Sequence, residues 1–243
     1  MRVIYSNWLR TKRTNVRYIS LFCPIIYAVL LGIYNVMSGT FKGELFESFF
    51  SIFGVLSCFS MSFFVPMVYE PDKKAGFYAN ELRSSAGRKK NFAGKFFFIA
   101  LLYLFIEFMA VFIFSFIILL FKNTEFNVLF IVIMFLLGYF TMLPMILIYQ
   151  VVNLKYSYSG SILLGCLTVL ASILLGTTGL GAGLWKILPF TWNIRINYLM
   201  VKSMISLRGV LFYILISLII TVILFIMCLL WYNKWEAKVK MED

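Results

Sequence analysis

The feature that most constrains this chain is a series of six apolar stretches, each about as long as a bilayer core is thick. A helix needs about 20 predominantly apolar residues to cross that core. The stretches cover residues 18–37, 49–69, 96–121, 128–152, 161–180 and 210–232. Because 62% of the 243 residues are hydrophobic and only 13% are charged, a water-soluble fold would have no room to bury them. The sequence predicts an all-α polytopic membrane protein with six transmembrane helices in one domain, 1–243.

Flanking charges predict how the spans are oriented. With the N-terminus inside, 16 of the 22 Lys and Arg residues flank the cytoplasmic ends and 6 flank the outer ends. Cytoplasmic flanks are enriched in Lys and Arg, so both termini are expected inside. The first stretch follows a basic leader, but it is longer than the 7–15 residues of a cleaved signal, so we interpret it as a retained helix.

Several functional classes are excluded by missing residue types. The chain has no histidine, which removes His-based metal sites and Ser-His or Cys-His triads. Its two aspartates, Asp72 and Asp243, both lie outside the apolar stretches, so an intramembrane aspartic dyad is excluded. The four cysteines lie singly inside apolar stretches, which is typical of small buried hydrophobes. No catalytic or metal-ligating residue is expected, and the scattered basic residues do not form a nucleic-acid-binding patch.

Two polar segments lie on the expected cytoplasmic side. In residues 1–17, apolar residues including Trp8 recur at helical spacing between basic ones, which favours an amphipathic helix in the inner headgroup layer over a plain basic leader. Residues 70–95 form a long loop between the second and third stretches. Within it, Phe77 and Tyr78 lie about one helical turn before Leu82. A short amphipathic helix could therefore present all three on one face to a cytosolic partner. The alternative is a solvated basic loop at anionic lipid headgroups.

The segment 181–209 precedes the last stretch and is expected outside. It is too polar to span and too apolar for a free loop, so we expect one or two short re-entrant or surface helices. Trp185 and Trp192 are candidate interface anchors, with Pro189 between them. Arg195 could meet an anionic group or reach out to the membrane surface. TTGLGAG at 177–183 only faintly matches a potassium filter, and small residues closing the fifth helix are the simpler interpretation.

Glu107 is the one ionisable residue deep within a span. Such residues are costly in lipid and usually face a bundle interior or a cavity. A single carboxylate with no histidine or second acid makes a poor proton relay, so Glu107 is a candidate for contact with a substrate or with another helix. Gly94-Lys95 is followed by Phe96, so it is not a Walker A motif. The chain is expected to bind no ATP itself.

The order of segments resembles the permease subunits of ABC-2-type (type V) exporters. The loop carries the resemblance: Glu70 follows the second span, and Ala75-Gly76, Leu82, Arg88 and Gly94-Lys95 follow in the family's order. The chain departs from the family pattern at residues 84–86, Ser-Ser-Ala, where a Ser-Pro step is common. The resemblance implies that the loop couples to a separate ATPase, with these candidate coupling residues: Glu70, Asp72, Gly76, Phe77, Tyr78, Leu82, Arg88 and Lys95.

Within that family, the small size, the Phe-rich spans and the WKILPFTW segment at 185–192 resemble the permeases of lantibiotic immunity transporters. This implies a bacterial plasma-membrane complex of two related permeases with two copies of a cytosolic ATPase. ATP and Mg would be bound by the ATPase, and the exported substrate would be a cationic antimicrobial peptide. Alternatives are an exporter of another peptide, a bacitracin-like antibiotic, a lipid or a glycan, or a non-transporting accessory or sensor protein.

Overall fold

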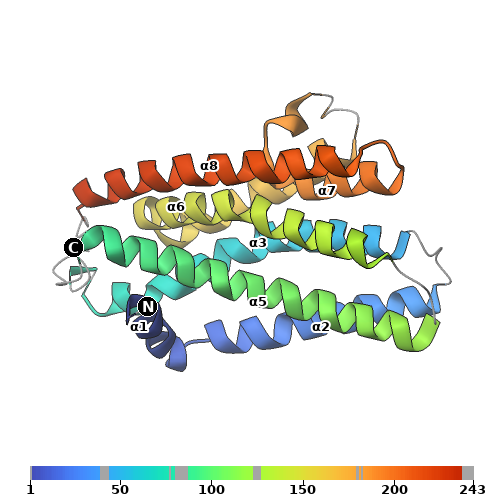
Figure 1. Cartoon of the computed structure of the whole chain (residues 1–243). Coiled ribbons are helices and arrows are strands. Elements are labelled where there is room, and N and C mark those ends of the chain that lie inside the picture. Colours follow the sequence, from blue (N-terminus) through green and yellow to red (C-terminus); the bar gives the residue numbers. More distant parts are fainter. Residues whose placement is uncertain are drawn as a thin grey trace.

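The structure is a computed structural model, and it describes residues 2–38, 44–76, 78–79, 87–122, 127–178, 181 and 183–236. Within these residues it is all-α (Figure 1). Five of the described helices are long and apolar enough to cross a membrane, as expected for a multi-pass membrane protein. In chain order the helices are α1 Arg2–Arg10, α2 Val16–Met37, α3 Glu44–Lys74, α5 Arg88–Lys122, α6 Val128–Thr177, α7 Pro189–Val201 and α8 Leu207–Lys234, with short 3-10 turns η1 Thr11–Arg13 and η3 Leu184–Lys186.

The helix α6 contains two of the predicted apolar stretches. At 50 residues it would be about 75 Å long if straight, far more than a bilayer core. Its backbone breaks at Ser157, where φ is 58° and ψ is −164°. Beyond the break the chain folds back on itself. This is shown by the Tyr149 hydroxyl, which lies 2.9 Å from the Thr168 hydroxyl, 19 residues later. The six predicted stretches therefore correspond to α2, α3, α5, the two limbs of α6, and α8.

Along the second limb of α6, small side chains face inward and large apolar ones face outward. The second limb of α6 buries a row of small residues: Ser161, Gly165, Thr168, Ser172 and Gly176. Its opposite face exposes Leu163, Leu167, Leu170 and Leu174. Small residues let helix backbones approach closely, and large apolar ones suit contact with lipid. A Cβ added at Gly165 would overlap the side chain of Ser62, which shows how close α6 lies to α3.

The loop predicted at 70–95 is shorter than expected, because the helices on both sides extend into it. α3 continues to Lys74 and α5 starts at Arg88, so only 75–87 lie between them rather than 70–95. Pro71 removes one backbone donor without ending α3. An i,i+4 ion pair of 2.6 Å between Lys74 and Glu70 and an Ala75 N–H bond of 3.0 Å to the Pro71 carbonyl complete the last turn. The charged ends of both helices extend beyond the apolar stretches that defined the prediction.

The two short helices take up different positions. α1 lies across the bundle beside the start of α5 (Figure 1). It exposes Tyr5, Trp8 and Leu9. α7 lies at the opposite end of the bundle (Figure 1), packs mainly against α6 and α3, and buries most of its side chains between Thr191 and Asn197. It is therefore packed inside protein rather than lying on a surface.

Candidate functional site

Two of the predicted coupling residues meet in a cluster of three charges at the end of the bundle where α1 lies. The Asp72 carboxylate on α3 accepts from Arg10 on α1 at 2.6 Å and from Lys95 on α5 at 2.8 Å. The Lys95 side chain is 2% exposed, and its ammonium lies 4.0 Å from the centre of the Tyr69 ring. A buried ammonium is costly unless an opposite charge and an aromatic face compensate it. We call Arg10, Asp72 and Lys95 the ion-pair cluster.

The helix α1 is also held by packing. A Cβ at Gly94 would overlap the Val3 side chain, so this glycine allows α1 to lie directly on α5. At its other end, α1 joins α2 through Arg17, which donates to the Trp8 carbonyl and lies with its guanidinium 4.0 Å from the Trp8 ring centre. A displacement of α3 or α5 at this end would therefore move α1.

Arg88 and Tyr78 connect the same region to α8. Arg88 donates to the Asn233 and Trp235 carbonyls at 3.2 and 3.4 Å. The Tyr78 ring packs 5.7 Å from Trp235 and 6.4 Å from Tyr69. Both residues therefore tie the helix ends together within this structure. Gly76 has φ of 117°, which favours glycine, and it ends the turn after α3. Of the three remaining predicted coupling residues, Phe77 and Leu82 lie outside the described residues.

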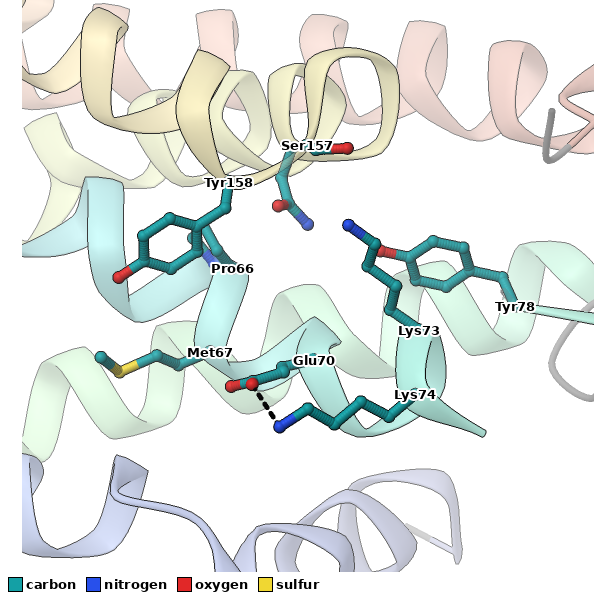
Figure 2. Close-up of a pocket in the computed structure, with 9 residues that line it drawn as sticks. Pro66, Met67, Glu70, Lys73, Lys74, Tyr78, Ser157 and Tyr158 are labelled. Carbon is teal, nitrogen blue, oxygen red and sulfur yellow. Dashed lines mark ion pairs between the residues drawn. The ribbon is translucent and has the colours of Figure 1, made fainter. Parts of the chain in front are cut away.

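Glu70 lies between two cavities. One, about 650 Å³, is bordered by the end of α3 and the α6 break (Figure 2). Its lining residues are Pro66, Met67, Glu70, Lys73, Lys74, Tyr78, Asn153, Ser157 and Tyr158. The other, about 380 Å³, separates α3 from Arg10, Thr14 and Asn15. Glu70 pairs with Lys74, and both side chains are largely exposed, so this ion pair is available to a partner.

Glu107 lies deep in the bundle, as its sequence position indicates. It is fully buried, and both of its carboxylate oxygens lack a hydrogen-bond partner among the described residues. The Glu107 Oε1 atom lies directly over Gly138 of α6, so a Cβ added at Gly138 would overlap this oxygen. The Asn193 amide nitrogen lies 3.6 Å from the same Cβ position and 2.6 Å from the corresponding position at Gly54. Two glycines therefore make room for a polar cluster of Glu107 and Asn193 where α3, α5, α6 and α7 meet.

At the opposite end, Arg195 borders an outer cavity of about 500 Å³. Its guanidinium carbon lies 5.5 Å from the Tyr198 ring centre, and the Lys202 ammonium lies 4.4 Å from the same ring. The hydrogen bond to Tyr198 raises the pKa of Lys202, so Lys202 stays charged. Glu47 supplies one acid, and Ser48 and Ser51 add hydroxyls. The described charged lining is therefore two cations and one anion.

The two tryptophans of the 181–209 segment are buried against protein. Trp192 is 1% exposed and Trp185 is 8% exposed. Trp192 Nε1 donates to the Trp185 carbonyl at 2.8 Å, and both rings pack near Tyr213. Pro189 is the first residue of α7, where its missing N–H costs nothing. All three residues therefore position α7, and the interface anchoring expected for the two tryptophans stays a prediction.

Sequence reasoning missed three residues. Arg10 reads in the sequence only as one of the flanking basic residues, although its place at the end of an amphipathic helix indicates a candidate for an ion pair. Asn153 and Asn193 are uncharged, and packing of distant segments brings their amides to the 650 Å³ cavity and to Glu107. Amides inside apolar or semi-apolar segments were the available signal for both.

Comparison of the chain with protein families, curated proteins and solved structures gives no match. The fold itself defines the class: an all-α protein whose long apolar helices make it an integral, multi-pass membrane protein.

Proposed function

We propose that this chain is the membrane-spanning permease subunit of an ATP-driven exporter of the ABC-2 type, with six spans and both termini cytoplasmic. In this proposal it removes a lantibiotic or a similar cationic antimicrobial peptide from the membrane. A second, related permease and two copies of a cytosolic ATPase complete the complex. The proposal rests on the family resemblance of the segment order and of the 70–95 pattern.

The observation that carries the coupling role is the ion-pair cluster. Asp72 and Lys95 lie on the two helices that flank residues 75–87 and pair with each other, and Arg10 connects Asp72 to α1. A partner that pulls on residues 75–87 would therefore move α3, α5 and α1 together. ATP-driven closure of such a partner would be transmitted as a rigid-body movement of the bundle.

Substrate is proposed to enter sideways from the outer leaflet, because an amphiphilic peptide is already in the membrane. The outer cavity supports one of the alternatives more specifically. Its two cations, Arg195 and Lys202, outnumber Glu47, so it favours a substrate with an anionic group. A lipid or glycan carried on a phosphate has that chemistry, and an exporter of such a molecule is the second candidate function.

The test is purification of the tagged full chain from its native host in mild detergent, with the bound proteins identified by mass spectrometry. We expect an ATPase with a Walker A motif and a second multi-pass permease. The double variant Phe77→Ala/Leu82→Ala should lose the ATPase and peptide tolerance while staying in the membrane. A matched control is Phe121→Ala/Leu129→Ala, because both side chains are exposed at the other end of the bundle. Absence of the ATPase from intact wild-type protein would refute the exporter, and equal ATPase recovery with both double variants would refute the loop's role.

A further inference from the structure

The inner cavity between α3 and the α6 break is built as a binding site. It runs about 12 Å along α3, from Pro66 to Lys74, at 1.5 Å per residue. The end of the cavity nearer the middle of the bundle is apolar, with Pro66 and Met67. The end nearer the end of α3 carries Glu70, Lys73 and Lys74 (Figure 2). A polarity gradient of this kind matches a molecule with apolar chains below a charged headgroup.

Hydrogen-bond donors dominate the polar lining. Asn153 is only 5% exposed, and its side-chain nitrogen is buried. This nitrogen has no hydrogen-bond partner among the described residues. Buried polar groups of this kind are normally satisfied, so one that faces a cavity indicates an absent acceptor. Lys73 reaches toward the cavity centre, and the Ser157 hydroxyl lies across from it (Figure 2).

Charge completes the argument. Among the described lining residues Glu70 is the one carboxylate, and it already pairs with Lys74 at 2.6 Å. Lys73 forms no ion pair with a described residue, so the described lining carries a surplus positive charge. Basic pockets between helices at the cytoplasmic side are suited to anionic lipid headgroups.

We propose that this cavity binds the phosphate group of an anionic phospholipid from the leaflet on the α1 side. Lys73 and the Asn153 amide hold the phosphate oxygens, and Pro66 and Met67 contact the upper part of the acyl chains. Because the backbone breaks at Ser157, the start of the second limb of α6 forms the wall of the cavity opposite α3. This site does not depend on the exporter proposal, because it requires neither ATP nor a partner protein.

The test uses the full chain in nanodiscs that contain phosphatidylcholine and increasing phosphatidylglycerol with the same acyl chains. Native mass spectrometry counts the phosphatidylglycerol molecules that stay bound. A charge-assisted hydrogen bond is worth about tenfold in affinity, so Lys73→Gln and Asn153→Leu should each weaken retention about tenfold. Lys155→Gln is the matched control, because Lys155 is exposed beside the α6 break and does not line the cavity.

The outcomes separate the proposal from general electrostatics. Selective loss with Lys73→Gln and Asn153→Leu, in proteins whose thermal midpoints in phosphatidylcholine match wild type, supports the site. Equal weakening by Lys155→Gln, or retention no greater than that of phosphatidylcholine, overturns it. Displacement of the lipid by soluble glycerol phosphate at equal concentration would show a free-phosphate site and overturn the lipid assignment. Loss of the lipid whenever a cytosolic protein co-purifies would overturn it in favour of a protein ligand.

Discussion

Replacing Asp72 by Asn should destabilise the protein far more than breaking the exposed ion pair two residues earlier. Asn keeps the size of Asp72 but removes the charge that lies 2.8 Å from the Lys95 ammonium. Lys95 is 2% exposed and Asp72 12%, so water screens this pair poorly. Removing one partner of a buried ion pair costs about 3–5 kcal/mol. Since the Tyr69 face still contacts Lys95, we expect the lower end, about 3 kcal/mol.

Glu70→Gln is the matched control on the same helix. It breaks an ion pair of 2.6 Å, but the two side chains are 75% and 49% exposed. Exposed pairs contribute at most about 1 kcal/mol. For a chain of this size, 1 kcal/mol shifts the thermal midpoint by about 2–4 °C. We therefore expect a fall of about 6–12 °C for Asp72→Asn and of at most about 4 °C for Glu70→Gln, measured by tryptophan fluorescence in one detergent.

A double variant tests the mechanism rather than the position. Asp72→Asn/Lys95→Met removes both buried charges, and Met fills a similar volume against the Tyr69 ring. Replacing a buried pair by an apolar group is often neutral, so the double variant should recover most of the stability that Asp72→Asn loses. A midpoint for Asp72→Asn equal to that of Glu70→Gln, or no recovery in the double variant, would refute the role given to the cluster.

Two further predictions concern the backbone. Ser157→Gly should stabilise the protein by about 1 kcal/mol, because φ of 58° with ψ of −164° is strained for serine and open to glycine. Ser159→Gly, two residues later in helical backbone, should instead destabilise the protein by about 0.5 kcal/mol. The thermal midpoints of the two variants distinguish these outcomes. Gly54→Ala should cost about 1–3 kcal/mol, since its Cβ would lie 2.6 Å from the Asn193 amide nitrogen and push α7 out of the bundle. Gly183→Ala, where a Cβ meets open space, should leave the midpoint unchanged, and a similar loss in both variants would contradict the close approach of α7.

Much of the architecture could be predicted because the bilayer imposes a length on apolar segments. The six stretches needed only hydropathy, and all six became helices or helix limbs. Helix ends were less predictable, since they depend on polar residues outside the apolar core. Pro71 reads as a helix stop, yet α3 continues three residues beyond it. The pairing of Asp72 with Arg10, 62 residues away, is a tertiary contact that no local pattern encodes.

The candidate site was less predictable for a related reason. In a chain whose interior and lipid-facing surface are both apolar, hydrophobicity does not tell which face of a span turns inward. The small and polar residues do: Gly138 and Gly54 leave the space that Glu107 and Asn193 occupy. Such groups would be costly against lipid, so their positions mark where helices meet. The same logic connects the ion-pair cluster, the cavity at the α6 break and the Glu107–Asn193 cluster. They lie beside α1, at the break in α6 and against α7, where backbone or side-chain polarity is added to an otherwise apolar bundle. Those are the places where the bundle can bind something other than lipid chains.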